Sequence, residues 1–180
     1  MDAFTARDDQ LTPHFQLSEF TASQTAVRCA VTNEPNDAQL LNLRRLALHG
    51  EDVRLVLGNV PVLVSSGFRH WIVNGLVKGL ISPDQLPYLE HRVDLICRCK
   101  LDTSAHMDGR AFDFCAPRFG APRDIVALLA AQDWLPFDQI IFEGGWVHYG
   151  IAREGERPRR QVLTAVFRPG EQPEYLAGLV

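Results

Sequence analysis

The stretch Ser-Ala-His-Met-Asp-Gly-Arg-Ala-Phe-Asp-Phe-Cys, residues 104–115, runs from a polar turn into an alternating segment typical of a β-strand. Phe112 and Phe114 alternate there with small or polar residues. Successive side chains of a strand point to opposite faces of a sheet, so both phenylalanines can face a core while Asp113 faces the other side. His106 lies just before this strand. The stretch predicts a sheet that buries aromatic rings on one face and presents a carboxylate on the other.

A second histidine lies in a predicted β-hairpin further along the chain. Two β-like runs form this hairpin, residues 138–142 and residues 146–150. Gly144-Gly145 joins them, as is typical of a tight turn, and His148 lies on the second run. Catalytic zinc sites usually hold the ion with three protein ligands and leave the fourth position for water. His106, Asp113 and His148 supply such a set without a thiolate, which predicts an open zinc site.

The remaining elements predict an α+β fold. Ser18 can cap a helix that runs toward Arg28, and either Asn36 or Asp37 can cap a second helix. Val60–Ser66 is typical of a short buried strand. Further expected elements are a helix over residues 125–131 and a strand over residues 160–167. We expect N-terminal helices packed on a small, mainly antiparallel sheet that carries the zinc site.

The length of 180 residues favours one domain, because two independent domains would each be small. We expect an N-terminal tail over residues 1–12, the domain over residues 13–170 and a C-terminal tail over residues 171–180. Within the domain, residues 78–103 read as an inserted helical segment. The four cysteines are expected to be free thiols, since Cys97-Arg98-Cys99 lacks both the usual zinc spacing and a second pair.

The charge balance and the N-terminal residues restrict the possible partners and the site of synthesis. A net charge of −4 provides no global positive field for nucleic acid, and charged residues interrupt every apolar run, so we expect no membrane span. The chain begins without a basic region followed by an apolar run, and we therefore expect cytoplasmic synthesis without a signal peptide. The basic cluster in residues 153–160 alternates with glutamates and is expected to be a solvated loop.

The sequence resembles the zinc D-Ala-D-Ala carboxypeptidase and endopeptidase family, especially its stand-alone C-terminal peptidase-domain branch. The family pattern S-x-H-x-x-G-x-A-x-D is matched from Ser104 to Asp113, and its W-x-H element at Trp146 and His148. Ser66-Gly67-Phe68-Arg69 resembles the family's S-G-Y-R element, with Phe in place of Tyr. The likeness covers roughly residues 13–166, and the long stretch between residues 74 and 104 departs from it. It implies a hedgehog/DD-peptidase-like fold with one Zn²⁺ per chain.

The resemblance also implies roles for residues around the metal. Arg69 would point into the cleft and steady a substrate carbonyl or carboxylate, although a structural ion pair is the alternative. Ser104 would bind substrate or orient His106, and a simple turn role is equally open. Trp146 would form a wall of the cleft, while core packing accounts for it equally well.

The position of the general base departs from the pattern of the family. Many relatives have an acidic residue or histidine three positions before the last ligand, where this chain has Gly145. A bulge at Gly144-Gly145 can turn the Glu143 side chain toward the metal face, and the stand-alone branch also has Glu before its W-x-H element. We therefore expect Glu143 to be the base, with Asp138 or a metal-bound hydroxide acting alone as alternatives.

These features predict a zinc-dependent peptidase that hydrolyses stem peptides or cross-links of bacterial peptidoglycan. A phage endolysin released at lysis, or a lytic component carried in a virion, would reconcile cytoplasmic synthesis with a wall substrate. The alternative is a phage tail or virion protein that retains the fold for binding, with weak or no peptidase activity and possible contacts to other tail proteins. A peptidase acting on non-wall peptides is a third possibility.

Overall fold

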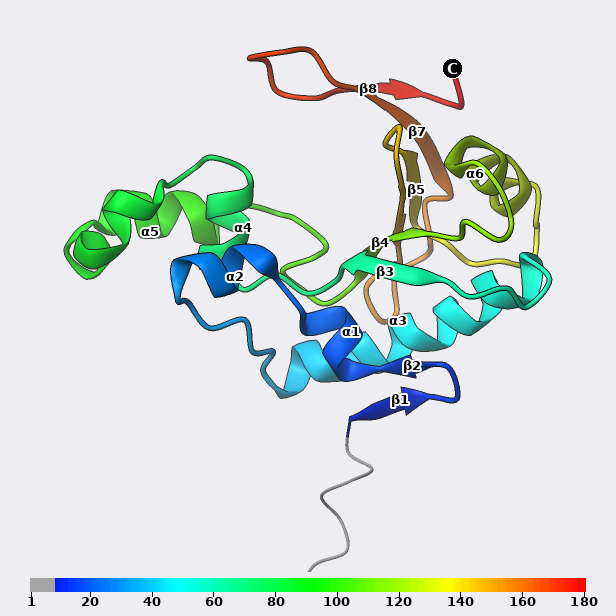
Figure 1. Cartoon of the computed structure of the whole chain (residues 1–180), viewed down its shortest axis with the longest axis horizontal. Helices are drawn as coiled ribbons and strands as arrows, with labels where there is room; N and C mark the ends of the chain where they lie inside the picture. The colour runs from blue at the N-terminus through cyan, green and yellow to red at the C-terminus, as the bar shows by residue number, and fades with distance from the viewer. Residues whose placement is uncertain (1–8) are drawn as a thin grey trace, which may run out of the picture.

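A computed structural model describes residues 9–180 and shows an α+β fold in which helices pack on a mixed β-sheet (Figure 1). Among these residues, the larger sheet has six strands in the order β3-β4-β6-β5-β7-β8. They are β3 (Leu63–Ser66), β4 (Ala111–Cys115), β5 (Gln139–Phe142), β6 (Val147–Gly150), β7 (Gln161–Val166) and β8 (Glu174–Ala177). A small second sheet pairs β1 (Gln10–Thr12) with β2 (Phe15–Gln16). The helices are α1 (Leu17–Thr21), α2 (Gln24–Cys29), α3 (Asp37–Val56), α4 (Trp71–Val77), the 3-10 helix η1 (Pro83–His91), α5 (Val93–Lys100) and α6 (Pro122–Ala130).

The larger sheet is antiparallel except between β5 and β7, which run parallel. Asp113 on β4 lies opposite His148 on β6, and His148 lies opposite Ile141 on β5. Directly opposed residues share a face of the sheet. The predicted single α+β domain with a mainly antiparallel sheet is confirmed, and its register places Asp113 beside His148.

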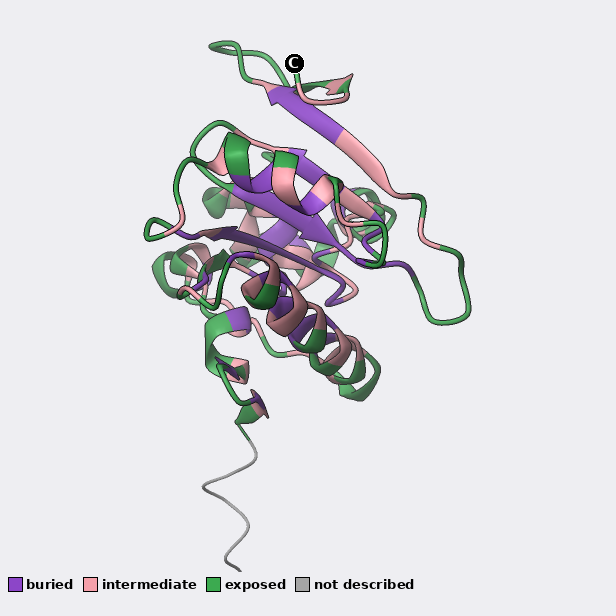
Figure 2. Ribbon diagram, turned by 90° about the vertical axis from the view of Figure 1, so that its right-hand side faces the viewer, coloured by how far each residue is buried: buried purple, intermediate pink, exposed green. Residues whose placement is uncertain are grey.

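The main hydrophobic core covers the face of this sheet that is opposite to Asp113 and His148. Phe112, Phe114, Val147 and Tyr149 alternate with the site residues along β4 and β6 and are fully buried. Helix α6 packs on β5 and β6 and also contacts α3. Figure 2 shows buried residues concentrated along the strands between these helices. The alternation in residues 111–115 therefore determines which face becomes core and which face carries the polar groups.

The N-terminal helices differ from the prediction in their number and caps. The expected single helix from Ser18 toward Arg28 is wrong: α1 ends at Thr21 and α2 begins at Gln24. The reason is Ser23, whose side chain accepts the Ala26 N–H and so begins a new helix. Asn36 caps α3 as predicted, because its side chain accepts the Gln39 N–H at 3.0 Å.

The segment 78–103 contains the helices η1 and α5, which lie beside α4 (Figure 1), so its predicted helical character is confirmed. It has its own small apolar cluster, in which Ile81, Leu89, Leu95 and Cys99 are buried. Cys99 and the three other cysteines are free. The segment therefore packs against α4 with a separate small core, on the side of the sheet away from α6 in Figure 1.

Both chain ends enter β-structure where the sequence predicts tails. The predicted N-terminal tail contains β1, while residues 1–8 lie outside the described part of the chain. The predicted C-terminal tail contains β8, which pairs with β7, so that Tyr175 lies opposite Ala165. The physical reason is that β7 would otherwise be an edge strand with unpaired N–H and C=O groups, which β8 satisfies. Within the expected tail of residues 171–180, Glu174–Ala177 thus form a strand of the main sheet.

The first predicted strand is shorter than expected, because β3 begins at Leu63 rather than at Val60. Pro61 has no N–H to donate to a ladder, which explains why pairing begins after it. None of the helices in the described residues is long and apolar enough to cross a bilayer.

Candidate metal centre

Three side chains that the sequence predicts as metal ligands converge on one face of the sheet. Asp113 comes from β4 and His148 from β6, in directly opposed positions. His106 reaches them from the turn that precedes β4. All three are buried, with exposed fractions of 4% for His106, 6% for Asp113 and 7% for His148. Their potential ligand atoms all lie within 4.8 Å of one another, so the group could hold a metal ion.

The distances within this group match the spacing around a small tetrahedral ion. His106 Nε2 lies 3.2 Å from His148 Nδ1, and His148 Nδ1 lies 2.9 Å from Asp113 Oδ1. The third side of the triangle, from His106 Nε2 to Asp113 Oδ1, measures 3.3 Å. Zn²⁺ bonds of about 2.0–2.1 Å in tetrahedral geometry require ligand atoms about 3.3–3.4 Å apart. The donor set could therefore hold a single metal ion of this size with shifts of a few tenths of an ångström.

The tautomer of His106 suits metal binding. Its Nδ1 lies 2.6 Å from the Gly67 carbonyl oxygen, which can only accept a hydrogen bond. Nδ1 must therefore carry the proton, and Nε2 presents its lone pair to the centre of the group. Burial lowers the pKa of His106, which keeps the imidazole in the neutral form that binds metals.

Asp113 is held as a carboxylate with its two oxygens in different roles. Burial alone would raise the pKa of Asp113, yet the neighbouring His106 and His148 hold this pKa far below its ordinary value. Oδ1 belongs to the ligand triangle, whereas Oδ2 accepts a hydrogen bond of 2.7 Å from Arg69. The Arg69 Nε also donates to the Ser66 hydroxyl at 2.9 Å. Arg69 is therefore an ion-pair partner of the predicted ligand Asp113 in this structure.

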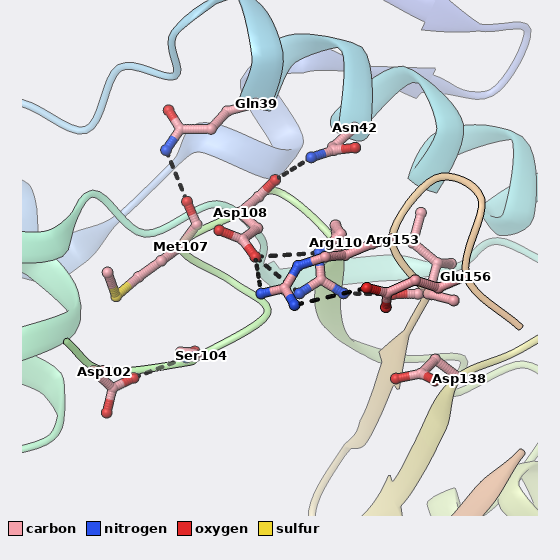
Figure 3. A network of polar contacts seen from close by, with 12 residues as sticks. Gln39, Asn42, Asp102, Ser104, Met107, Asp108, Arg110, Asp138, Arg153 and Glu156 are labelled. Atoms are coloured by element: carbon pink, nitrogen blue, oxygen red, sulfur yellow. Dashed lines mark hydrogen bonds and ion pairs between the residues drawn. The ribbon is translucent and has the colours of Figure 1, made fainter. Parts of the chain in front are cut away.

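The turn that carries His106 is fixed to α3 by hydrogen bonds on its outer side (Figure 3). Gln39 donates to the Met107 carbonyl at 2.8 Å, and Asn42 donates to the Asp108 carbonyl at 2.9 Å. Arg110 pairs with the Asp108 carboxylate at 2.8 Å. These contacts restrain the backbone that directly follows His106 and so limit the positions that its imidazole can take.

Glu143 lies at the start of the turn between β5 and β6, where it is paired with Trp146. The Glu143 N–H donates to the Trp146 carbonyl at 3.1 Å, and Gly144 provides the positive φ of 72° that this turn requires. The Trp146 indole N–H in turn donates to Glu143 Oε2 at 2.6 Å. Burial, reinforced by the charge of Asp113, raises the pKa of Glu143 above its ordinary value. The Glu143 carboxylate therefore lies within electrostatic range of the metal group.

Two further predicted site residues, Ser104 and Asp138, have other partners. Ser104 is half-buried, and its backbone N–H donates to the Asp102 carboxylate at 2.9 Å, which shapes the turn before His106. Asp138, the alternative base, accepts several hydrogen bonds from Arg159, the shortest of them 2.6 Å. Although partial burial acts against it, this pairing holds the pKa of Asp138 below its ordinary value. Asp138 thus has a structural partner and stands outside the ligand group.

One residue near the site was missed because the sequence places it in a tail. Tyr175 belongs to β8, and its side chain is about half exposed. Burial, and then the charges of Glu143 and Asp113, raise the pKa of Tyr175 above its ordinary value. The alternation around Tyr175 is too short to reveal a strand, so no local signal could have found it.

A scan against models of known protein families found no match, and a search of curated proteins found none either. The described structure thus supports a buried His-Asp-His group in an α+β fold. The resemblance to zinc peptidases rests on the motif residues of the sequence.

Proposed function

We propose that this protein is a zinc-dependent peptidase that hydrolyses stem peptides or cross-links of bacterial peptidoglycan. The observation that carries the proposal is the triangle of His106, Asp113 and His148, whose sides of 2.9–3.3 Å suit one tetrahedral ion. Two nitrogen ligands and one carboxylate leave a fourth position open, as in catalytic rather than structural zinc sites. The substrate class comes from the motif resemblance.

The residues around the triangle have separate roles in peptide hydrolysis. A bound zinc ion supplies a water of lowered pKa, about 7, and polarises a peptide carbonyl. Glu143 accepts a proton from the attacking water and delivers it to the leaving amine, a role worth roughly 10² to 10⁴ in rate. The Trp146 indole holds one Glu143 oxygen, which leaves the other oxygen for the proton.

Arg69 supports the reaction through Asp113 and through its remaining donor groups. Its hydrogen bond fixes Asp113 Oδ2 and so orients Oδ1 toward the metal position. The Arg69 Nη1 group makes no hydrogen bond within residues 9–180, so it is available for a substrate carbonyl or carboxylate. Ser104, two positions before His106, and Trp146, two positions before His148, are proposed as substrate contacts.

The first experiment measures zinc content and release of peptides from purified peptidoglycan. We expect about one zinc per chain in the wild type, and loss of both zinc and activity in His106→Ala. His91→Ala is the matched control, because His91 lies on η1 and its side chain is 77% exposed. Glu143→Gln should keep zinc and lose activity. A wild type that binds no zinc in the presence of micromolar Zn²⁺ would rule out the proposed centre.

A binding role in a phage tail or virion is the second candidate function. The exposed apolar side chains of the segment 78–103 favour it, because Tyr88, Val93 and Leu101 expose 66%, 68% and 78% of their surface and a partner protein could cover them. A zinc-loaded, folded wild type that releases nothing from any peptidoglycan preparation would favour this role. In either case, the protein would reach the wall through release at lysis or as a part of the virion.

A further inference from the structure

Helix α3 presents a row of leucines to solvent on the side that faces away from the main core. This leucine row consists of Leu41, Leu48 and Leu55, which expose 52%, 60% and 59% of their surface. Seven residues separate each leucine from the next along a helix of 20 residues, so all three lie on one line within about 20° per step. Buried Leu43 and Leu46 hold the opposite side of α3 in the core. The helix therefore has two apolar sides, and only one of them is covered within residues 9–180.

A leucine at every seventh position is typical of a helix that pairs lengthwise with another helix. Such a repeat places one apolar side chain at every second turn along the same line, where a partner helix can cover all of them. A helix that packs only on its own domain has polar residues on its outer side instead. Single exposed leucines are common on protein surfaces, whereas a line of three on one helix indicates a helical partner.

The charged residues beside the leucine row determine which partner fits it. Arg44 and Arg45 lie on its two flanks before Leu48, and Glu51 and Asp52 lie on its two flanks after Leu48. Each acidic residue follows an arginine by seven positions and therefore shares the flank of that arginine. Arg44 is exposed and forms no ion pair within residues 9–180. The surface of α3 thus has a positive half and a negative half, with Leu48 between them.

Two copies of this chain can cover the leucine row for each other when their α3 helices pair antiparallel. A twofold axis beside Leu48 brings the same surface of both subunits together. A residue that precedes Leu48 by a given number of positions then lies beside the partner residue that follows it by the same number. Leu41 therefore lies beside the partner's Leu55, and Leu48 lies beside its own equivalent. All three leucines of both copies are covered in this arrangement.

The charges favour this orientation over a parallel one. In the antiparallel pair, Arg44 lies on the same flank as the partner's Glu51, and Arg45 lies on the same flank as the partner's Asp52. Glu51 also accepts hydrogen bonds within its own chain, but 24% of its side chain remains exposed. A parallel pair would place equivalent residues side by side, so that arginine meets arginine and acid meets acid. Opposite charges across an interface favour the complex, and like charges exclude the wrong arrangement.

The metal group stays clear of such a contact. Helix α3 packs on the face of the sheet opposite to Asp113 and His148, because its buried residues belong to the core that contains Phe112 and Phe114. A helix of 20 residues is about 30 Å long and about 10 Å wide. Its footprint is smaller than the roughly 800 Å² per partner of a standard-size interface. We therefore expect a reversible dimer with both metal groups on the far sides of the sheets from the contact.

We propose that the leucine row of α3 is a dimerisation surface, and that its partner is a second copy of this chain bound antiparallel about Leu48. The three leucines form the apolar centre of the contact, and the charged residues on its flanks fix the orientation. Dimerisation through this row is independent of the peptidase function, because the row lies outside the metal group.

Sedimentation equilibrium of the full chain, from low to high micromolar concentration, measures its oligomeric state. The average mass of the wild type should rise from one chain toward two chains. Leu48→Glu should weaken dimerisation at least about tenfold, because it places two carboxylates side by side at the twofold axis. Its circular dichroism spectrum should not change, since Leu48 is exposed. Leu101→Glu is the matched control, because Leu101 is 78% exposed and follows α5, and it should dimerise as the wild type does. A wild type that stays monomeric, or a Leu48→Glu variant that dimerises equally well, would overturn the proposal.

Disulfide cross-linking tests the orientation of the two helices. All variants carry Cys97→Ser, because Cys97 is an exposed thiol. Under mild oxidation, a mixture of Leu41→Cys and Leu55→Cys proteins, one of them with an affinity tag, should form linked heterodimers. Leu48→Cys should cross-link to its own copy, whereas Leu41→Cys alone should form few linked dimers. Efficient linking of Leu41→Cys to itself, without heterodimers in the mixture, would show a parallel pair and overturn the antiparallel arrangement.

Discussion

Gly67 couples the stability of the fold to the orientation of a predicted metal ligand, and Gly67→Ala tests this coupling. A Cβ at this position would lie 2.4 Å from the Phe20 carbonyl oxygen and 2.7 Å from the Phe20 Cα. Both are backbone atoms of α1, and the same carbonyl accepts the Phe68 N–H at 2.7 Å. Relief of the clash must therefore move α1 away from the end of β3 or break this hydrogen bond. The Gly67 carbonyl, which accepts from His106 at 2.6 Å, would move as well.

The expected loss of stability follows from these contacts. Overpacking costs about 1–3 kcal/mol, and three backbone atoms within 2.9 Å place Gly67→Ala near the upper end. The smaller entropy of the unfolded alanine variant offsets about 0.4–1 kcal/mol. A net loss of about 2 kcal/mol corresponds to a melting temperature about 4–8 °C lower in a chain of this size. Displacement of the Gly67 carbonyl should also weaken zinc binding about 10- to 100-fold.

Thermal denaturation followed by circular dichroism, and zinc competition with a chromophoric chelator, measure these two effects. Gly145→Ala is the matched control, because a Cβ there meets no atom within 4 Å. Its free energy of unfolding should stay within about 0.5 kcal/mol of the wild type. A Gly67→Ala variant that melts within 1 °C of the wild type and binds zinc equally well would refute the close approach of β3 to α1.

Three further predictions concern the metal, the proposed base and a structural ion pair. Zinc present at 100 times its Kd stabilises the folded protein by about 2.7 kcal/mol, so its removal by EDTA should lower the melting temperature by about 5–11 °C. Calorimetry should show no such change in the melting temperature of His106→Ala. In metal-free protein, Trp146 fluorescence should titrate with an apparent pKa above the ordinary glutamate value of about 4.3, since burial raises the pKa of Glu143, and Glu143→Gln should abolish this transition. Asp138→Asn should cost about 1–2 kcal/mol at pH 7 by removing hydrogen bonds from Arg159. Because the folded-state pKa of Asp138 lies below its unfolded value of about 3.9, this contribution is present above the unfolded pKa and is lost as pH falls through the folded pKa. Urea titrations at pH 7 and pH 3 measure the difference in free energy of unfolding between the wild type and Asp138→Asn. Equal differences at the two pH values would contradict the ion pair between Asp138 and Arg159.

Residues close in sequence made part of the site predictable. Alternation from Ala111 to Cys115 places Asp113 opposite the buried phenylalanines, and glycines between two β-like runs indicate the hairpin that carries His148. Such patterns are readable because the strand period and turn chemistry act over a few residues. The same local reasoning failed at Ser18, where the capping preference of Ser23 divides the expected helix.

The sequence by itself determined the donor types, their order along the chain and the face of β4 on which Asp113 lies. Only the tertiary structure decided that His106 turns Nδ1 to the Gly67 carbonyl, that Arg69 pairs with Asp113, and that Tyr175 reaches this face from β8. These features depend on strand order and on backbone contacts between distant segments. Long-range pairing is set by burial of the whole core and by the need to satisfy edge-strand hydrogen bonds, and neither leaves a signature in a short stretch of sequence.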